Sequence, residues 1–80
     1  MATLRLFAQA REAADTSSVD LPGATVGEVL DAAMGRFGER FSEILGESKV
    51  WCNGDPADRE TPVGDGDEVA VLPPVSGGGL

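Results

Sequence analysis

Apolar and polar residues alternate at the start of the chain, as they do in a strand with one buried face. Within residues 3–7, Leu4 and Leu6 share one side of the predicted strand, which makes that side the core face. Phe7 falls on the other side, so it either turns inward at the strand end or lies on the outer surface of the sheet. Residues 8–15 are rich in alanine and predict a short helical turn. Residues 19–21 predict a brief second strand before a Pro-Gly turn. The two strands are expected to pair as neighbours.

The pattern then changes to a helical period. Between residues 26 and 37 the apolar residues recur at three- and four-residue intervals, which predicts the main helix with one buried face. Thr25 is the expected N-cap, because Glu28 follows it at the spacing of a capping box. Gly38 is well placed to end this helix, and residues 41–45 continue in a shorter helical segment.

Residues 49–52 predict a third strand that leads into a hairpin. Trp51 falls on the opposite face of this strand from its two neighbours. Asn53-Gly54 predicts a type I′ turn, in which both residues adopt positive φ. The return strand must be short, because Pro56 lies in it and cannot donate to a ladder.

The chain ends with one more strand and a tail. The largely β-branched run 69–72 predicts a strand buried near the middle of a sheet. A hairpin, a main helix and a last strand beside the first predict an α+β fold of the β-grasp type, with a mixed sheet packed on the helix. We therefore expect a β-grasp domain over residues 1–72 and an extended, flexible C-terminal tail over residues 73–80.

Two prolines separate the last strand from this tail. Pro73 and Pro74 lack a backbone N–H, so they stop the ladder and direct the chain away from the sheet in an extended form. From Pro73 to Gly78, an extended chain reaches roughly 20 Å. Such an arm can enter a narrow channel of another protein, whereas an inert glycine-rich linker would need no rigid starting point.

Composition excludes several classes of function. The net charge of −8, from 14 acidic and 6 basic residues, argues against nucleic acid as a partner. It favours a partner with a basic face, or serves only solubility. Six acidic residues gather in the segment 55–68, against Arg59 alone, and this segment leads directly into the last strand and the tail.

The lack of histidine limits the catalytic and metal sites that this sequence can build. The chain has no histidine and one cysteine, Cys52, which excludes a zinc site built by the protein and a Cys–His pair. Cys52 is interpreted as a buried structural residue rather than a nucleophile. Neither a leader pattern nor a membrane-spanning run is apparent, so a cytoplasmic protein without bound cofactor is expected.

Four segments together resemble the small, sulfur-carrying subunit of molybdopterin synthase and the related thiamine-pathway carrier. Their order and spacing match these ubiquitin-like carriers over nearly the whole chain. One departure is that Gly79 and Leu80 follow the diglycine that normally ends the family's chains. The matching segments are Phe7-Ala8-Gln9-Ala10-Arg11-Glu12, Asn53-Gly54, Gly64-Asp65-Gly66-Asp67-Glu68-Val69 and Pro73-Pro74-Val75-Ser76-Gly77-Gly78.

This resemblance implies a sulfur carrier without a catalytic site of its own. A ubiquitin-activating-type adenylyltransferase would use ATP to adenylate the carboxylate of Gly78, with Gly77 beside it, and sulfur would then give a thiocarboxylate. The molybdopterin synthase large subunit would accept the tail and its sulfur. Because Gly79 and Leu80 follow, a processing peptidase would first have to remove them.

The resemblance also implies a docking patch on the outer face of the sheet. Phe7 and Leu72 match two of its positions, Trp51 is an open case, and Pro56 stands where a larger aliphatic residue is common. The expected partner contacts in the tail are Pro73, Pro74, Val75 and Ser76. Other classes remain open: a carrier for thiamine, cysteine or tRNA thiolation, a ubiquitin-like modifier, or a β-grasp interaction module whose tail is never activated.

Overall fold

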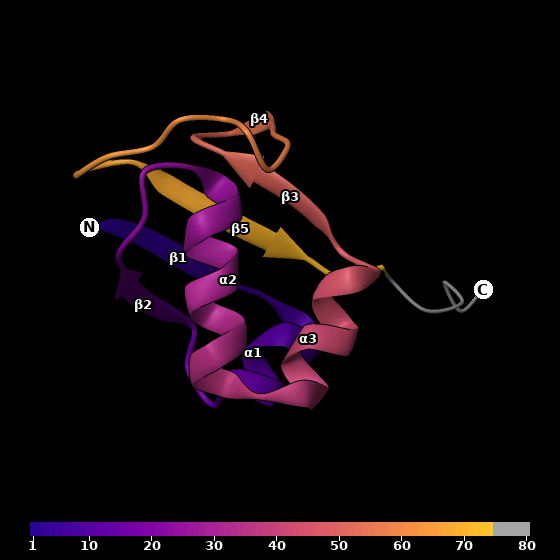
Figure 1. Ribbon diagram of the computed structural model, residues 1–80. Helices are drawn as coiled ribbons and strands as arrows, with labels where there is room; N and C mark the ends of the chain where they lie inside the picture. Colours follow the sequence, from indigo (N-terminus) through magenta and orange to yellow (C-terminus); the bar gives the residue numbers. More distant parts are fainter. Residues whose placement is uncertain (75–80) are drawn as a thin grey trace.

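Residues 1–74 are described by a computed structural model, and their elements follow the predicted order (Figure 1). Where the sequence predicted only a helical turn after the first strand, the structure has a full short helix, α1. The elements are β1 (Ala2–Leu6), α1 (Ala8–Ala14), β2 (Ser18–Leu21), α2 (Val26–Phe37), α3 (Glu39–Gly46), β3 (Lys49–Cys52), β4 (Asp55–Pro56) and β5 (Glu68–Leu72).

The strands form one mixed sheet in the order β2-β1-β5-β3-β4. The first and last strands, β1 and β5, pair in parallel, and the other neighbours pair antiparallel. The prediction of a central last strand is therefore confirmed. Helix α2 crosses one face of the sheet, and α1 and α3 lie together towards the end where β5 finishes (Figure 1). This arrangement is the α+β, ubiquitin-like β-grasp fold.

The core lies between the sheet and α2. Strand alternation places Leu4 and Leu6 of β1 beside Val69 and Val71 of β5, and all four are at most 1% exposed. Burying one such aliphatic side chain contributes about 1.5–3 kcal/mol before entropy is counted. The buried apolar residues are Ala2, Leu4, Leu6, Ala10, Ala14, Leu21, Val26, Val29, Leu30, Ala33, Phe41, Leu45, Cys52, Val69 and Val71.

Helix α2 begins as the sequence predicted, with one difference. The Glu28 backbone N–H donates to Oγ1 of Thr25 at 3.2 Å, so Thr25 is the N-cap. The Glu28 carboxylate accepts from the backbone N–H of Ala24 at 2.8 Å, one residue earlier than in a standard capping box. The side chains still satisfy two backbone donors at this helix end.

Backbone carbonyls of the loop between β4 and β5 accept hydrogen bonds from the first N–H groups of α2. The backbone N–H of Val26 donates to the Thr61 carbonyl at 2.9 Å, and that of Gly27 donates to the Arg59 carbonyl at 2.9 Å. The Arg59 guanidinium also reaches both carboxylate oxygens of Asp31 at 2.9 Å. These bonds hold the long loop against α2, because they satisfy donors that a helix N-terminus otherwise leaves open.

Gly27 is required by this close approach. A Cβ at this position would lie 3.0 Å from the Arg59 carbonyl oxygen and 3.1 Å from the Arg59 Cβ, whereas a Cβ on Gly35 of the same helix would meet nothing within 4 Å. We expect Gly27→Ala to lower the free energy of unfolding, since the loop must move away. Gly35→Ala should raise it by about 0.5–1 kcal/mol, the helix preference for alanine. Urea denaturation measures the free energy of unfolding of both variants. An equal increase in both would show that the loop moves away from α2 without an energetic cost.

Candidate docking face and tail attachment

The outer face of the sheet brings Phe7 beside Leu72. Phe7 follows Leu6 and Leu72 follows Val71, and Leu6 and Val71 are partners in the parallel ladder. Phe7 keeps an extended backbone, with φ −130° and ψ 154°, so its side chain stays on the outer face. It is 39% exposed, and the inward alternative for Phe7 is excluded.

A charged pair lies next to this aromatic residue. The Arg5 guanidinium carbon is 6.0 Å from the centroid of the Phe7 ring, within the range of a cation–π contact. Arg5 Nη1 also lies 3.5 Å from Oε2 of Glu68. Both charged side chains are about half exposed, so the pair contributes little to stability.

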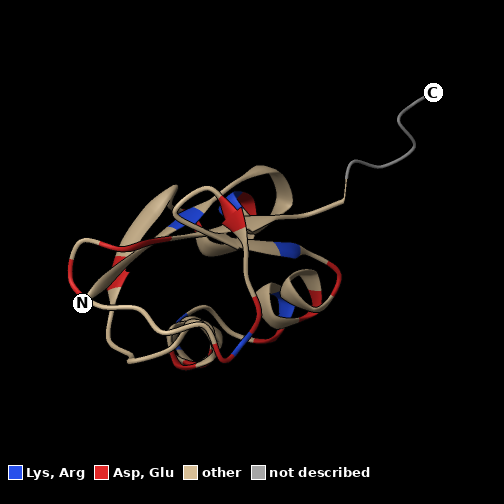
Figure 2. Ribbon diagram, turned by 90° about the horizontal axis from the view of Figure 1, so that it is seen from above, with Lys and Arg blue, Asp and Glu red and all other residues tan. Residues whose placement is uncertain are grey.

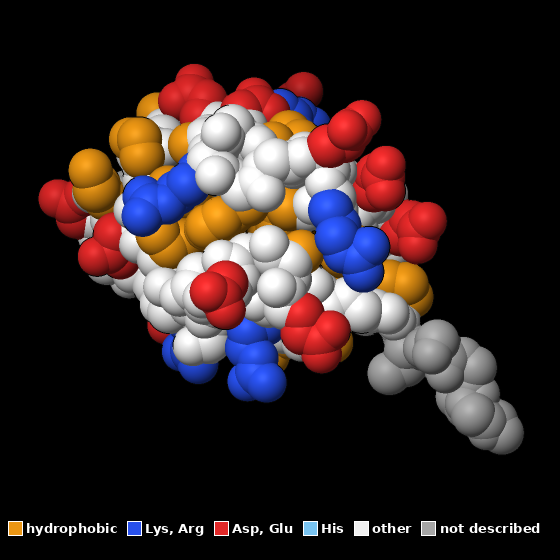
Figure 3. All heavy atoms as spheres, turned by 90° about the horizontal axis from the view of Figure 1, so that it is seen from below, with side chains coloured by type: hydrophobic (Ala, Val, Ile, Leu, Met, Phe, Trp, Pro, Cys, Tyr) orange, Lys and Arg blue, Asp and Glu red, His pale blue; other side chains and the backbone are white. Residues whose placement is uncertain are grey.

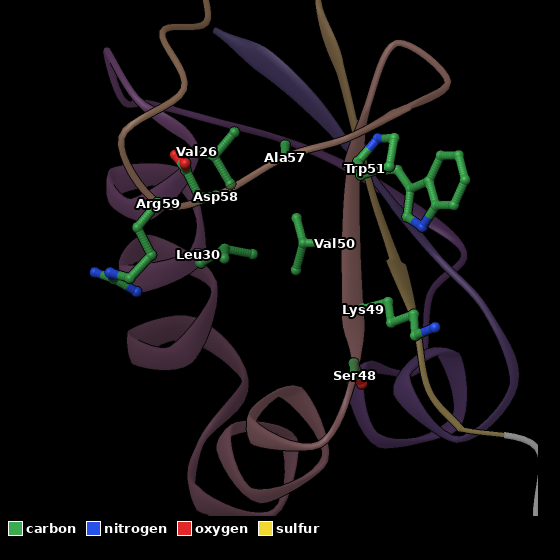
Figure 4. A pocket seen from close by; sticks show the side chains of 10 residues that line it. Val26, Leu30, Ser48, Lys49, Val50, Trp51, Ala57, Asp58 and Arg59 are labelled. Carbon is green, nitrogen blue, oxygen red and sulfur yellow. The ribbon is translucent and has the colours of Figure 1, made fainter.

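Trp51 and Lys49 extend the outer face across β3. Trp51 is the partner of Ala70, and Lys49 is the partner of Leu72. Figure 4 shows the side chains of Lys49 and Trp51 on the side of β3 away from α2, while Val50 points towards that helix. Trp51, an open case from sequence, thus lies half-buried on the same face as Leu72.

The tail attaches where β5 meets α1 and α3. Pro73 and Pro74 border a small hollow of about 140 Å³ together with Gln9 of α1 and Ile44 of α3. Arg40, Glu43 and Glu47 complete its rim. Pro73 is half-buried and Pro74 is exposed, so the described chain ends at the surface. The predicted tail residues Val75, Ser76, Gly77 and Gly78, and the following Gly79 and Leu80, lie outside the described residues.

The acidic residues are not distributed as their sequence order suggested. Asp65, in the turn before β5, binds the Met1 amino group, so this turn lies at the opposite end of the sheet from the tail attachment (Figure 2). Segment 55–68 therefore leads towards the tail along the chain but not in space, because β5 separates the two. Acidic side chains lie on the surface near the end of the described chain (Figure 3). Of these, the exposed Glu43 of α3 and Glu47, which follows α3, border the hollow beside Pro73 and Pro74.

Cys52 faces the core, as the sequence predicted, and is 9% exposed. Burial raises the pKa of its thiol, and the negative charges of Asp67 and Asp55 raise it further. Because the thiolate is the reactive form, this environment suits a structural cysteine.

Within residues 1–74, no three His, Cys, Asp or Glu side chains are placed to hold a metal ion. Nor does this part of the chain contain a helix long and apolar enough to cross a membrane.

Asp67 joins the two turns at the far end of the sheet. Its carboxylate accepts from Nδ2 of Asn53 at 3.0 Å and from the backbone N–H of Gly64 at 2.8 Å. The side chain of Asn53 in turn accepts from the backbone N–H of Glu68 at 2.9 Å. The bonds from Asn53 and Gly64 hold the pKa of Asp67 below its usual value. Asn53 and Gly54 have φ of 51° and 87°, as a type I′ turn requires.

The fold defines a class, the ubiquitin-like β-grasp proteins. The model of the ThiS family matches residues 4–78 of this chain. The chain therefore belongs to the ThiS family.

Relatives with different names share this similarity. The chain is 39% identical over 88 residues to the molybdopterin synthase sulfur carrier subunit of Aedes aegypti, covering 94% of this chain and 86% of the relative. It is also 39% identical over 84 residues to small archaeal modifier protein 1 of Haloferax volcanii, covering 92% of this chain and 97% of the relative. The relatives of this chain thus include proteins named as carriers and as modifiers.

A solved complex has the same fold. The chain matches a structure of the complex of subunits 1 and 2 of the molybdopterin-converting factor of Helicobacter pylori, with a TM-score of 0.70 and 27% identity. The match covers 95% of this chain and 96% of that one.

The Asp67 network predicts a pH dependence of stability. The folded-state pKa of Asp67 is lowered, so its stabilisation is fully present above the unfolded value, about pH 4. It is lost as the pH falls through the folded value. Asp67→Asn should lower the free energy of unfolding at neutral pH and flatten its acid dependence below about pH 4, measured by urea denaturation across pH.

Asp65 provides the matched control. The Met1 amino group lowers the pKa of Asp65, and this exposed ion pair is screened by salt. In about 0.5 M salt, Asp65→Asn should keep the acid dependence of the unaltered chain, while Asp67→Asn should still be flattened. If the free energy of unfolding of Asp67→Asn fell with acid as steeply as that of the unaltered chain, the hydrogen bonds of Asp67 would not be the source of the pH dependence.

Proposed function

We propose that this chain is a cytoplasmic sulfur carrier for molybdopterin biosynthesis, acting as the small subunit of a molybdopterin synthase. The observation that carries the proposal is the family match through Gly78, joined to 39% identity with a named molybdopterin synthase sulfur carrier subunit over nearly the whole chain. Gly78 is the proposed reactive residue and Gly77 its neighbour.

The chemistry requires activation of a terminal carboxylate. An adenylyltransferase partner would use ATP to join AMP to the carboxylate oxygen of Gly78, releasing pyrophosphate. A persulfide sulfur would then form a C–S bond at the carbonyl carbon while the acyl–oxygen bond breaks and AMP leaves. Reduction of the remaining S–S bond by a thiol would leave the thiocarboxylate. ATP is used by the partner, and the carrier contributes the carboxylate.

The described surface supports a docking role in this reaction. Phe7, Leu72 and Trp51 offer apolar and aromatic area next to the tail attachment, and aromatic residues often anchor interfaces. The proposed large subunit would receive Pro73, Pro74, Val75 and Ser76 as the base of the inserted arm. The Helicobacter pylori relative is solved as a complex of two subunits, which supports a partner of this kind.

A ubiquitin-like modifier is the second candidate. It is favoured by the 39% identity to small archaeal modifier protein 1. The adenylate would be common to both routes, and the nucleophile would differ: a persulfide sulfur gives the carrier, whereas a lysine amine of a target gives an amide. The product distinguishes the two routes: the activated chain becomes a thiocarboxylate in the carrier route and an amide of a target protein in the modifier route.

The first test of the proposal concerns the end of the chain. Chains ending at Gly78, Gly79 and Leu80 are incubated with the adenylyltransferase, ATP and a sulfur donor, and their intact masses are measured. Replacement of oxygen by sulfur adds about 16 Da. We expect it only on the chain ending at Gly78, because only there is the carboxylate of Gly78 itself free for activation. A peptidase that removes Gly79 and Leu80 would then be needed in the cell.

The outcomes separate the candidates. Equal conversion of the chain ending at Leu80 would disprove the need for processing. Activation without sulfur gain, followed by amide formation on target lysines, would favour the modifier. Conversion of the pyranopterin precursor after adding the large subunit would support the molybdopterin role.

The second test concerns the docking face. Phe7→Ala should weaken binding to the adenylyltransferase or the large subunit by about 1 kcal/mol or more, roughly fivefold in Kd, since an exposed aromatic anchor is removed. Thr3→Ala is the control, because Thr3 lies on the same strand and face but at the other end of β1. Titration calorimetry measures both, and equal affinity of Phe7→Ala and the unaltered chain would remove Phe7 from the interface.

A further inference from the structure

The sequence holds a single lysine, Lys49, and the fold places it beside the start of the tail. In the antiparallel ladder of β3 and β5, Lys49 is the partner of Leu72, so their two Cα atoms are about 5 Å apart. Pro73 follows Leu72 directly. The lysine thus lies at the point where the tail leaves the sheet.

The Lys49 amine is accessible to a reacting group. Figure 4 shows its side chain on the side of β3 away from α2, and the residue is exposed. Within residues 1–74 it makes no ion pair. The amino group of Met1, by contrast, binds Asp65 at the other end of the sheet. Of these two primary amines, Lys49 is therefore the one next to the tail.

The tail is long enough to return to this amine. Pro73 and Pro74 direct the chain away from the sheet and carry it about 6 Å outward. Residues 75–78 then span up to about 13 Å, and the lysine side chain reaches about 6 Å from its own Cα. Two of these four residues are glycines, which permit a tight reversal of the chain. Gly78 can therefore meet the Lys49 amine without any change in the sheet.

A reaction within one molecule also has a concentration advantage. Two groups joined by a short flexible linker meet at an effective concentration on the order of 1 mM. In a solution of about 10 µM chain, ring closure should therefore exceed the coupling of two chains roughly a hundredfold. An activated carboxyl group on Gly78 would accordingly meet the lysine of its own chain first.

We infer that Lys49 is an internal acceptor for the activated carboxyl group of Gly78. The lysine nitrogen forms a C–N bond to the Gly78 carbonyl carbon, the acyl–oxygen bond to AMP breaks, and the nitrogen releases one proton to solvent. The product is an isopeptide bond that closes residues 49–78 into a ring and leaves no carboxylate to receive sulfur. The inference rests on the proposed function in one respect, the activation of Gly78.

This ring closure competes with sulfur transfer. Lys49 lies on the outer face together with Trp51 and Leu72, which belong to the proposed docking face. A partner docked there would cover the lysine and keep the activated tail for the persulfide. Docking would thus protect the activated carboxyl group as well as bind the carrier.

The test uses the chain ending at Gly78, prepared as a C-terminal thioester so that no adenylyltransferase is needed. Attack by Lys49 breaks the C–S bond and releases the thiol, and the ring has a mass about 18 Da below that of the hydrolysed acid. We expect the same rate at about 1 µM and about 10 µM chain, since ring closure within one molecule does not depend on concentration. Trypsin, which cleaves after Arg40 and Arg59, should release residues 41–59 joined to residues 60–78.

Two variants locate the acceptor. Lys49→Arg keeps the positive charge and should leave only hydrolysis of the thioester. Adding Asp20→Lys to this variant restores a lysine on the outer face, but on β2, where its partner Thr3 lies opposite Glu68 and not opposite Leu72. That lysine is about 16 Å from Leu72, so its ring closure should be at least roughly tenfold slower than that of the unaltered chain.

Three results would overturn the inference. The first is hydrolysis alone, or coupling of two chains alone, in the unaltered chain. The second is a product about 18 Da lighter in Lys49→Arg, because another nucleophile would then be the acceptor. The third is equally fast ring closure in the variant with Asp20→Lys, because the place of the lysine would then not matter. Failure of the adenylyltransferase to activate the chain would instead contradict the proposed function, and the thioester result would be unaffected.

Discussion

The parallel pairing of β1 with β5 is the constraint on which the rest of the structure depends. These strands come from the two ends of the described chain, and their inward residues, among them Leu4 and Val69, are fully buried beneath α2. A parallel pair cannot be joined by a tight turn, so everything between the two strands must act as the crossover. The domain is therefore complete only when its last strand is in place, and the fold is rich in contacts between distant residues.

The same pairing determines where the tail begins. In a parallel pair the two chains leave the sheet at the same end. Phe7 follows β1 and Pro73 follows β5, so the exposed aromatic residue and the first residue of the tail emerge side by side. The proposed docking face and the attachment of the tail are thus two consequences of one register, and a partner bound to that face would meet the tail at a defined place.

Sequence analysis was accurate where the determining contacts are local. The cap formed by Thr25 and Glu28 depends on residues three apart, and the turn at Asn53-Gly54 depends on the φ angles of two adjacent residues. Alternation along a strand likewise placed Leu4 in the core and Phe7 on the opposite side of the strand. The position of the last strand beside the first followed once these elements were joined into a β-grasp. Apart from the position of the last strand, each of these features is encoded by residues close together in the sequence.

Features that depend on register or on loop docking were not accessible from sequence. Periodicity shows that Trp51 opposes its neighbours, but only the pairing with Ala70 places it on the face shared with Leu72. The acidic turn around Asp65 adjoins the last strand in sequence, yet the length of β5 carries the tail to the other end of the sheet. The helical pattern did not show that position 27 needs a glycine. That requirement comes from the carbonyl of Arg59, in a loop 32 residues further along the chain. Long-range contacts of this kind are energetically decisive but leave no local periodicity, so the three-dimensional pairing has to be known before surface residues can be assigned to one interface.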